Sequence, residues 1–233
     1  MRTSVLGACL VLLLIAIPCS AQSSGSAHGG FEGADAQAFD ELVLGSKRRS
    51  ATWAQAPELV VLMSEMQYRA GESKTYLATP ERLPDDEVNQ LIDDLSTALA
   101  VLTDGVFTTF ASVRRELVEE GTATDMLRPG AIVVGRFRGV KHATHSIGFG
   151  GRTVNPTGTI TSGAMMLDAD YDRASSARRL LRTHELGHAL GYNHVVSRSS
   201  VMNARIGADF TDFDRKAATV AFRGSPGSRT SGE

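Results

Sequence analysis

The chain has 233 residues, of which 42% are hydrophobic, and its formal net charge at pH 7 is −2. A chain of this length and hydrophobic content can bury one substantial core, so the sequence predicts a single main domain. The near-neutral charge gives no sign of a surface for nucleic acid or for an anionic membrane, and we expect neither as a partner.

The N-terminal segment has the pattern of a secretory signal peptide. Arg2 supplies a positive charge, residues 5–17 form an apolar run, and the small residues Cys19 and Ala21 precede a cleavage point after Ala21. We therefore expect residues 1–21 to be removed on export. The mature protein would be secreted or periplasmic, without stable membrane insertion. An uncleaved membrane anchor is the alternative, which the short apolar run disfavours.

Both cysteines of the chain, Cys9 and Cys19, lie in this segment. The mature protein would then contain neither a disulfide nor a thiolate ligand for a metal. Lipid anchoring is not expected. "LGAC" (residues 6–9) precedes most of the apolar run, and Pro18 stands directly before Cys19 in "AIPC".

The remaining chain divides by composition into an extension, a domain and a tail. Residues 22–36 are rich in Gly, Ser and Ala, so residues 22–50 are predicted to be a flexible N-terminal extension in which His28 is solvated. The domain is expected over residues 51–223, with its ordered part beginning near Trp53. Residues 224–233 are predicted to be a flexible tail.

The first half of the domain predicts two strands and a long helix. Residues 58–68 and 73–79 have extended, partly β-branched character. The next segment, residues 83–105, carries apolar residues at helical spacing, with Pro84 at its start and Gly105 at its end. These apolar residues are predicted to face the core: Val88, Leu91, Ile92, Leu95, Leu99 and Leu102.

The second half predicts a sheet followed by two helices. Strands are expected over residues 106–113, 130–139 and 158–172, with a glycine-marked loop at residues 148–151. A helix is expected from about residue 174 to 190. Another is expected over residues 211–222, capped by Thr211 or Asp212. The predicted fold class is α+β (α/β-like), with a small mixed twisted sheet.

Residues 182–202, "RTHELGHALGYNHVVSRSSVM", contain the most specific pattern in the chain. His184 and His188 are four residues apart, so a helix places both imidazoles on one face, one turn apart. Gly191 can adopt a positive φ and end the helix, which lets His194 return as a third ligand. Glu185 is offset around the helix, where it can hold a metal-bound water without binding the metal.

Three neutral histidines leave one position of a tetrahedral Zn²⁺ open. Structural zinc sites are closed by four protein ligands, whereas catalytic sites keep a water, whose pKa the metal lowers to about 7. Glu185 could take the proton of that water and later deliver it to a leaving amine. The pattern therefore indicates hydrolysis of a peptide bond or a related amide.

The run from His184 to His194 matches H-E-x-x-H-x-x-G-x-x-H at every fixed position and resembles the zinc-binding motif of the metzincins. Met202 follows His194 by eight residues, which is similar to the Met-turn spacing of the matrixins. The resemblance implies a metzincin-type catalytic domain with His184, His188 and His194 as zinc ligands. It also implies that Glu185 is the general base and that Met202 forms a hydrophobic floor beneath the zinc.

The resemblance further implies a cleft between an upper sheet lobe and a lower lobe after Gly191. In metzincins an extended substrate pairs with an edge strand before the zinc helix, and residues 159–167, "TITSGAMML", would be that strand. The expected partner is thus a peptide or protein substrate bound in extended form. The domain itself is expected to be a monomer.

The chain also departs from the matrixin pattern. Val195 stands where matrixins usually have serine, and Asn203 begins a segment that lacks their Pro-x-Tyr. The specificity pocket of the matrixins is therefore not transferable. No tyrosine follows Met202 at the spacing of a tyrosine zinc ligand. Without a cysteine in the mature chain, a cysteine switch for latency is impossible.

Two weaker constellations precede the histidine motif. Asp168, Asp170 and Asp172 alternate in "DADYD" and could bind Ca²⁺, as matrixins do in the corresponding stretch. Asp170 replaces the histidine of a second matrixin zinc site, which argues against a second zinc here. The alternative is a strand end whose negative charge favours the following helix N-terminus. His142 and His145 indicate either another metal site or a polar loop on the cleft rim.

The sequence thus predicts a secreted zinc endopeptidase. Two alternatives stay open. A metzincin-like scaffold could hold zinc and serve only as a binding module, although zinc binding does not require Glu185. The same chemistry could also hydrolyse an amide outside proteins, such as that of a cell-wall peptide.

Overall fold

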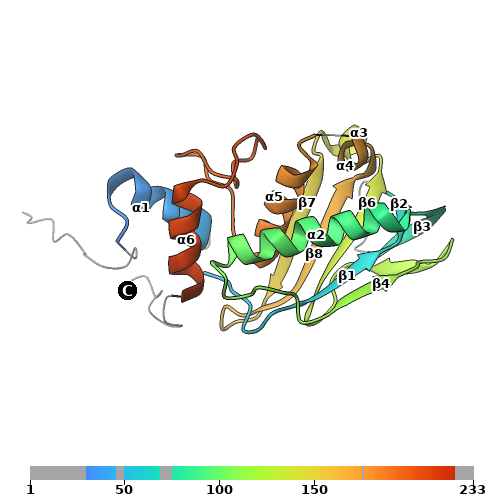
Figure 1. Cartoon of the computed structure of the whole chain (residues 1–233), viewed down its shortest axis with the longest axis horizontal. Coiled ribbons are helices and arrows are strands. Elements are labelled where there is room, and N and C mark those ends of the chain that lie inside the picture. Colours follow the sequence, from blue (N-terminus) through green and yellow to red (C-terminus); the bar gives the residue numbers. More distant parts are fainter. Residues whose placement is uncertain (1–29, 46–49, 69–74, 175, 224–233) are drawn as a thin grey trace, which may run out of the picture.

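The computed structural model describes residues 30–45, 50–68, 75–174 and 176–223 (Figure 1). The predicted signal peptide, His28 and the predicted tail at 224–233 lie outside the described residues. The helices are α1 (Gly33–Phe39), the π-helical turn η1 (Asp40–Leu44), α2 (Asp85–Leu102), α3 (Val140–Thr144), α4 (Ala169–Ala174), α5 (Arg178–Leu190) and α6 (Asp212–Arg223). The strands are β1 (Glu58–Leu62), β2 (Ser64–Gln67), β3 (Thr75–Arg82), β4 (Val113–Glu116), β5 (Ala123–Asp125), β6 (Ala131–Arg138), β7 (Gly148–Val154) and β8 (Ile160–Asp168).

The described residues form an α+β fold around a mixed twisted sheet, which confirms the predicted fold class. Strands β4, β1, β6 and β8 are parallel neighbours, and β7 adds an antiparallel edge beyond β8. Strand β2 also pairs with β6 and leads into antiparallel β3 and β5. None of the described helices is long and apolar enough to cross a membrane.

Helices α2 and α5 pack against each other, and α5 also lies on β7 and β8 (Figure 1). The apolar stripe predicted for α2 is confirmed, because five of its six members are buried and Ile92 is half-buried. Successive residues of β1 alternate between the two faces of the sheet. Leu59 and Val61 join the core under the helices, whereas Val60 and Leu62 join a smaller core on the opposite face.

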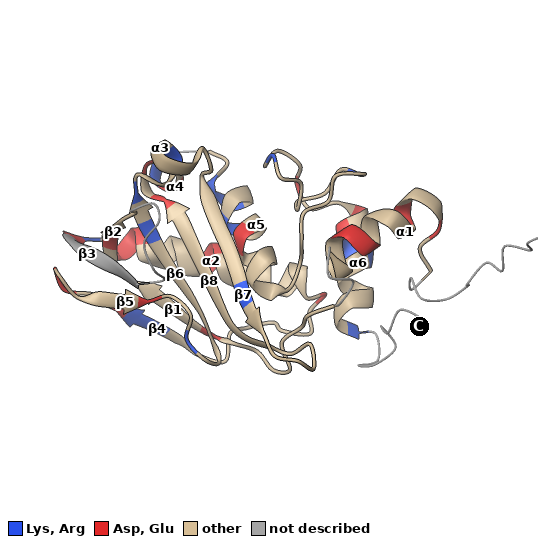
Figure 2. Cartoon of the chain, turned by 180° about the vertical axis from the view of Figure 1, so that it is seen from behind, with Lys and Arg blue, Asp and Glu red and all other residues tan. Residues whose placement is uncertain are grey.

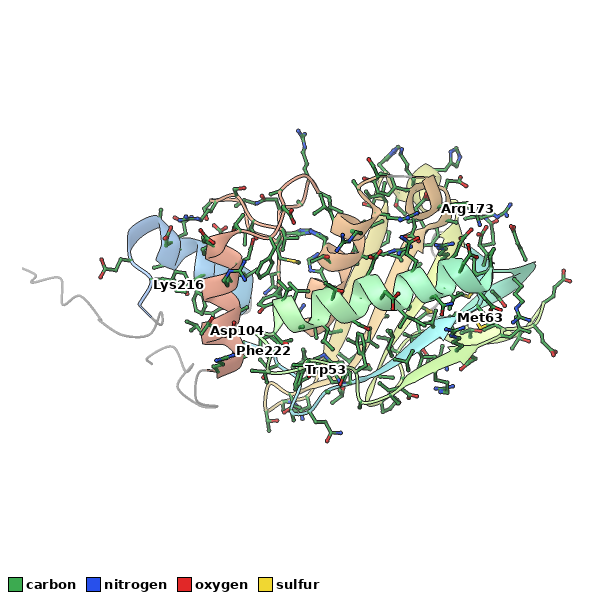
Figure 3. The ribbon with its side chains drawn as sticks, viewed as in Figure 1. Trp53, Met63, Asp104, Arg173, Lys216 and Phe222 are labelled. Atoms are coloured by element: carbon green, nitrogen blue, oxygen red, sulfur yellow. The ribbon has the colours of Figure 1, made fainter. Side chains whose placement is uncertain are left out.

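The end of α2 meets α6 through a short ordered connection. Thr103 Oγ1 accepts a hydrogen bond from the backbone N–H of Phe107, and the Phe107 ring contacts Phe222 of α6. Figure 3 shows Asp104 and Phe222 together at this junction. The strand predicted over residues 106–113 is therefore wrong, and β4 begins only at Val113. Phe107 of this segment packs against α6, and Phe110 is buried in the core.

The N-terminal segment also differs from the prediction. Residues 33–44, expected within a flexible extension, form α1 and η1 and lie beside α6 (Figure 1). Phe31 stacks on Phe39 at a centroid distance of 4.9 Å and meets Phe213 of α6 edge-on at 5.7 Å. These rings are buried, so the segment gains enough apolar contact to order a chain that is rich in small residues.

The region before α5 contains three further differences. Strand β8 ends at Asp168 and α4 follows it, so the strand expected over 158–172 is too long. The glycine-marked loop at 148–151 is wrong, because these residues belong to β7. Strand β8 lies between β6 and β7, so "TITSGAMML" is not an edge strand, and β7 takes that place.

Candidate metal centre

Helix α5 presents two of the three histidines, and the turn after it presents the third. Residues 181–190 of α5 are buried except for Thr183 and His188, which are half-buried. The helix ends at Leu190, and Gly191 adopts a φ of 121°, as predicted from its place in the motif. The next backbone N–H, that of Tyr192, returns to the carbonyl of Gly187, and the chain then brings His194 back to the helix.

The three imidazoles converge through their Nε2 atoms. The separations are 3.3 Å for His184–His194, 3.2 Å for His184–His188 and 3.1 Å for His188–His194. A tetrahedral zinc with Zn–N distances near 2.0–2.1 Å places two donor atoms roughly 3.3 Å apart. Among the described residues, these histidines are the group of His, Cys, Asp or Glu side chains arranged so that they can hold a metal ion.

Two of the rings are oriented by backbone carbonyls. His184 Nδ1 lies 2.8 Å from the carbonyl oxygen of Val201, and His188 Nδ1 lies 3.0 Å from that of Tyr192. Each Nδ1 must carry the proton to donate to a carbonyl, so each Nε2 presents a lone pair. Two lone pairs facing one another repel, whereas a cation between them is attracted to both.

Burial disfavours protonation of these histidines. It lowers the pKa of His188 to about 3, and it also lowers the pKa of His184 and of the more exposed His194. A metal binds only the unprotonated nitrogen. The site is therefore ready to accept a metal ion at pH values where free histidine would carry a proton.

Glu185 lies beside the triad without belonging to it. Its side chain is buried, and burial raises its pKa to about 8, while a hydrogen bond from the backbone N–H of Gly150 opposes that shift. Strand β7 makes this contact possible only with glycine, because a Cβ at position 150 would overlap the backbone oxygen of Glu185. The sequence predicted that Gly148 and Gly150 mark a loop. In the structure they allow the edge strand β7 to approach α5 closely.

Met202 packs against the helix that carries His184 and His188. It is buried, and a Cβ on Gly187 of α5 would collide with its sulfur. The turn is held by Asp214 of α6, whose carboxylate accepts hydrogen bonds from Ser200 and from the backbone N–H of Val201. Because Val201 also supplies the carbonyl that orients His184, the Met202 turn connects α6 to the metal centre.

Asn203, where the matrixin pattern is lost, has a clear local role. Its Nδ2 donates to the carbonyls of Val195 and Arg198, at 2.7 and 2.8 Å, and its Oδ1 accepts from the N–H of Ser200. The side chain therefore ties together the loop that follows His194. The motif comparison gave no signal for this role.

Arg152 of β7 is a second residue that sequence reasoning missed. Its guanidinium donates to the carbonyls of His188 and Tyr192, at 2.9 and 3.1 Å, and to Oδ1 of Asn193 at 3.0 Å. The negative end of the helix dipole favours a cation at this place. Arg152 shares with Gly148 and Gly150 the face of β7 that meets α5. This alternation was the only signal in the sequence, and it was missed because the glycines were predicted to form a loop.

A cavity of about 710 Å³ opens next to the triad. It is lined by Gln37, Asp40, Glu41, Leu44, Gly45, His188, Asn193 and His194. One wall therefore comes from the N-terminal segment, which the sequence placed in a flexible extension. Desolvation raises the pKa of Glu41, but hydrogen bonds from Val196, Ser197 and Gln37 outweigh it and lower the pKa.

The structure does not bring Asp168, Asp170 and Asp172 together, so it gives the calcium interpretation no support. Asp168 accepts hydrogen bonds from the backbone N–H groups of Lys141 and Tyr171. Asp172 is fully buried and paired with two arginines, and Asp170 is exposed on α4. The switch from strand to helix at Ala169 separates the carboxylates, and they form no metal-holding group among the described residues.

His142 and His145 lie in and just after α3 and are exposed. They join no metal-holding group within the described ranges. This outcome agrees with the alternative of a polar segment.

No protein family model matches the chain, and no curated protein sequence matches it either. The fold and the site nevertheless define a class. The chain is an α+β protein with three histidines, from one helix and the following turn, that can hold a metal ion beside a buried carboxyl group.

Proposed function

We propose that the protein is a secreted zinc-dependent endopeptidase of metzincin type. One observation supports this proposal above the others. Three Nε2 atoms lie 3.1–3.3 Å apart, which suits three corners of a zinc tetrahedron, and the buried Glu185 lies next to them without being a ligand. A closed structural site would need a fourth protein ligand and would have no use for that carboxyl group.

A zinc ion held by His184, His188 and His194 would supply Lewis acidity and would lower the pKa of a bound water to about 7. The chain's own residues would do the rest. Glu185 receives a proton from the attacking water and returns it to the amine that leaves. The first step needs the carboxylate form of Glu185, and the second needs its protonated form. Burial, which raises the pKa of Glu185, favours the form that holds the proton for the leaving amine, and the N–H of Gly150 donates a hydrogen bond to the side chain.

The position of β7 favours a substrate in extended form. Strand β8 is covered on both sides, whereas no strand of the described chain pairs with the outer edge of β7. Since β7 touches α5 beside Glu185, a peptide added along that edge would run past the histidines. The backbone of β7 would bind the peptide backbone. The neighbouring cavity would receive one side chain of the substrate.

The test is cleavage of an unbiased peptide library by the parent protein and by Glu185→Gln, side by side. We expect both to contain one zinc per chain, because Glu185 is not a ligand. The variant should cleave about 10²–10⁴-fold more slowly, since it lacks the proton carrier. Elemental analysis of the same samples provides the control for zinc content.

The same experiment separates the proposal from its rivals. A zinc-loaded parent that cleaves nothing in the library would favour a binding module. Cleavage of cell-wall peptides alone would favour an amidase. If Glu185→Gln cleaved as fast as the parent with zinc present, the proposed role of Glu185 would be wrong.

A further inference from the structure

The N-terminal segment contacts the metal centre at one particular place, the loop that carries the third histidine. We call residues 30–45 the N-terminal clamp. The clamp packs beside α6, and Figure 3 shows Lys216 of α6 on the side facing it. Lys216 Nζ donates to the carbonyl of Gly30 at 2.8 Å and lies 4.3 Å from the ring centre of Phe31. These contacts attach the clamp to α6.

The clamp binds the residue that precedes His194 in its loop, Asn193. The carbonyl of Leu42 accepts hydrogen bonds from the backbone N–H of Asn193 at 2.8 Å and from its Nδ2 at 3.1 Å. The side chain of Asn193 also lies against Gly45, where a Cβ would come within 2.8 Å of it. The residue directly before His194 is thus fixed in both backbone and side chain.

The clamp holds the loop after the histidine as well, through Glu41. Its Oε2 accepts hydrogen bonds from the N–H of Val196 at 2.9 Å, from the N–H of Ser197 at 3.1 Å and from the Ser197 hydroxyl at 3.0 Å. Asp35 adds an ion pair to Arg198 in the same loop. His194 therefore lies between two anchoring points that belong to one N-terminal segment.

His194 needs such support more than its two partners do. His184 and His188 sit on a packed helix, and carbonyls orient both rings through Nδ1. For His194, no described residue accepts a hydrogen bond from Nδ1, and the side chain is exposed. Its position is set by the backbone of its loop. A ligand held in this way loses affinity for its metal when its supporting hydrogen bonds are removed.

We propose that Glu41 is a positioning residue for the third metal ligand, and that the N-terminal clamp thereby sets the metal affinity of the site. The clamp is then an integral part of the metal centre and not a removable covering of it. The inference rests on the zinc site of the proposed function but is independent of whether the protein cleaves peptides.

The test compares zinc binding by the full chain and by Glu41→Ala, Glu41→Gln and Ser197→Ala. Glu32→Gln is the matched control, since it removes an exposed carboxylate at the start of α1 that makes no capping hydrogen bond. His194→Ala marks complete loss of the third ligand. Zinc dissociation constants come from competition with a chromophoric chelator. Visible absorption of the Co²⁺-loaded proteins reports the coordination number.

We expect Glu41→Ala to weaken zinc binding about 10–100-fold and to shift the Co²⁺ spectrum toward that of His194→Ala. Glu41→Gln retains one acceptor oxygen and should fall between Glu41→Ala and the parent. Glu32→Gln should match the parent. A parent-like dissociation constant and Co²⁺ spectrum for Glu41→Ala would overturn the proposal.

Two further results keep the test decisive. If Glu41→Ala does not fold without metal, the decision passes to Glu41→Gln and Ser197→Ala, and parent-like zinc affinity in both would overturn the proposal. If the parent binds zinc but cleaves nothing, the proposed function fails while the clamp is still measurable. If the parent cleaves and Glu41→Ala keeps full zinc affinity, the clamp alone fails.

Discussion

The two ends of α5 bury polar groups in opposite ways. At its N-terminal end Arg182 donates to Asp172 and Asp94, each at 2.7 Å, and Arg136 reaches the same Asp172 at 2.7 Å. Figure 2 shows further acidic and basic residues on β2, β6 and α4 at that end of the molecule. Toward its C-terminal end, His184 and His188 of α5 and His194 of the following turn bring their Nε2 atoms within 3.1–3.3 Å of one another.

The two clusters differ in whether the protein alone satisfies their polar groups, and this difference separates a structural cluster from a functional one. Around Asp172, every buried charge meets an opposite charge of the protein, so the cluster is complete without a ligand. Around His188, the protein orients the rings but leaves their metal-binding atoms facing one another. The first cluster should therefore determine stability, and the second should determine binding.

Substitution of Asp172, at the N-terminal end of α5, should change the free energy of unfolding most. Replacing Asp172 with Ala leaves two buried guanidinium groups without their shared partner. It should lower the free energy of unfolding by about 3–5 kcal/mol. Urea unfolding of the metal-free protein measures this loss. The control is Asp170→Ala on the same helix, which is exposed and should stay within about 0.5 kcal/mol of the parent. Similar losses in both variants would contradict the distinction.

Zinc should stabilise the protein only by binding the three histidines. A zinc concentration 100 times the dissociation constant should raise the free energy of unfolding by about 2.7 kcal/mol. The variant His188→Ala, which lacks one ligand, should show a much smaller rise at the same zinc concentration. Unfolding curves with zinc and with a chelator give both values. An equal rise in the parent and the variant would place the zinc elsewhere.

A smaller effect is expected where β7 meets α5. Gly150→Ala introduces a methyl group against the backbone of Glu185. It should cost about 1–3 kcal/mol of stability and slow peptide cleavage. Gly151→Ala is the matched control, because its Cβ would have nothing within 4 Å, and it should behave like the parent. Equal behaviour of the two variants would show that the approach of β7 to the helix is not tight.

The smallest effect concerns pH. Three imidazoles with ordinary pKa values near 6.5 would lose up to about 10³-fold in zinc affinity at pH 5.5, because protons compete for each nitrogen. Burial holds the pKa of His188 near 3 and lowers those of His184 and His194. His188 stays unprotonated at pH 5.5, and burial makes His184 and His194 harder to protonate than free histidine, so the loss should be smaller than 10³-fold. Competition titrations between pH 5.5 and 7.5 measure it, and a full 10³-fold loss would contradict the effect of burial.

The sequence predicted the local parts of this structure well. The apolar spacing of α2, the short distance from His184 to His188, and Gly191 at the helix end all act within one or two turns of chain. Local periodicity and backbone preference decide such features, and both can be read from neighbouring residues.

The parts that depend on distant contacts were missed. Gly148 and Gly150 suggested a loop, but their small size is required by a helix more than 30 positions later in the chain. Asp172 looked like one of three metal ligands until the fold supplied Arg136 and Arg182. The N-terminal clamp had a flexible composition, yet its Phe31 contacts Phe213 of α6. No local pattern contains these partners.

The central claim is that the three histidines hold zinc with one position left open for water. Zinc K-edge X-ray absorption of the loaded full chain tests it most directly. We predict three imidazole nitrogens at about 2.0–2.1 Å and one further light ligand, with one imidazole lost in His188→Ala. A spectrum with a fourth protein imidazole, or one unchanged by His188→Ala, would contradict the claim.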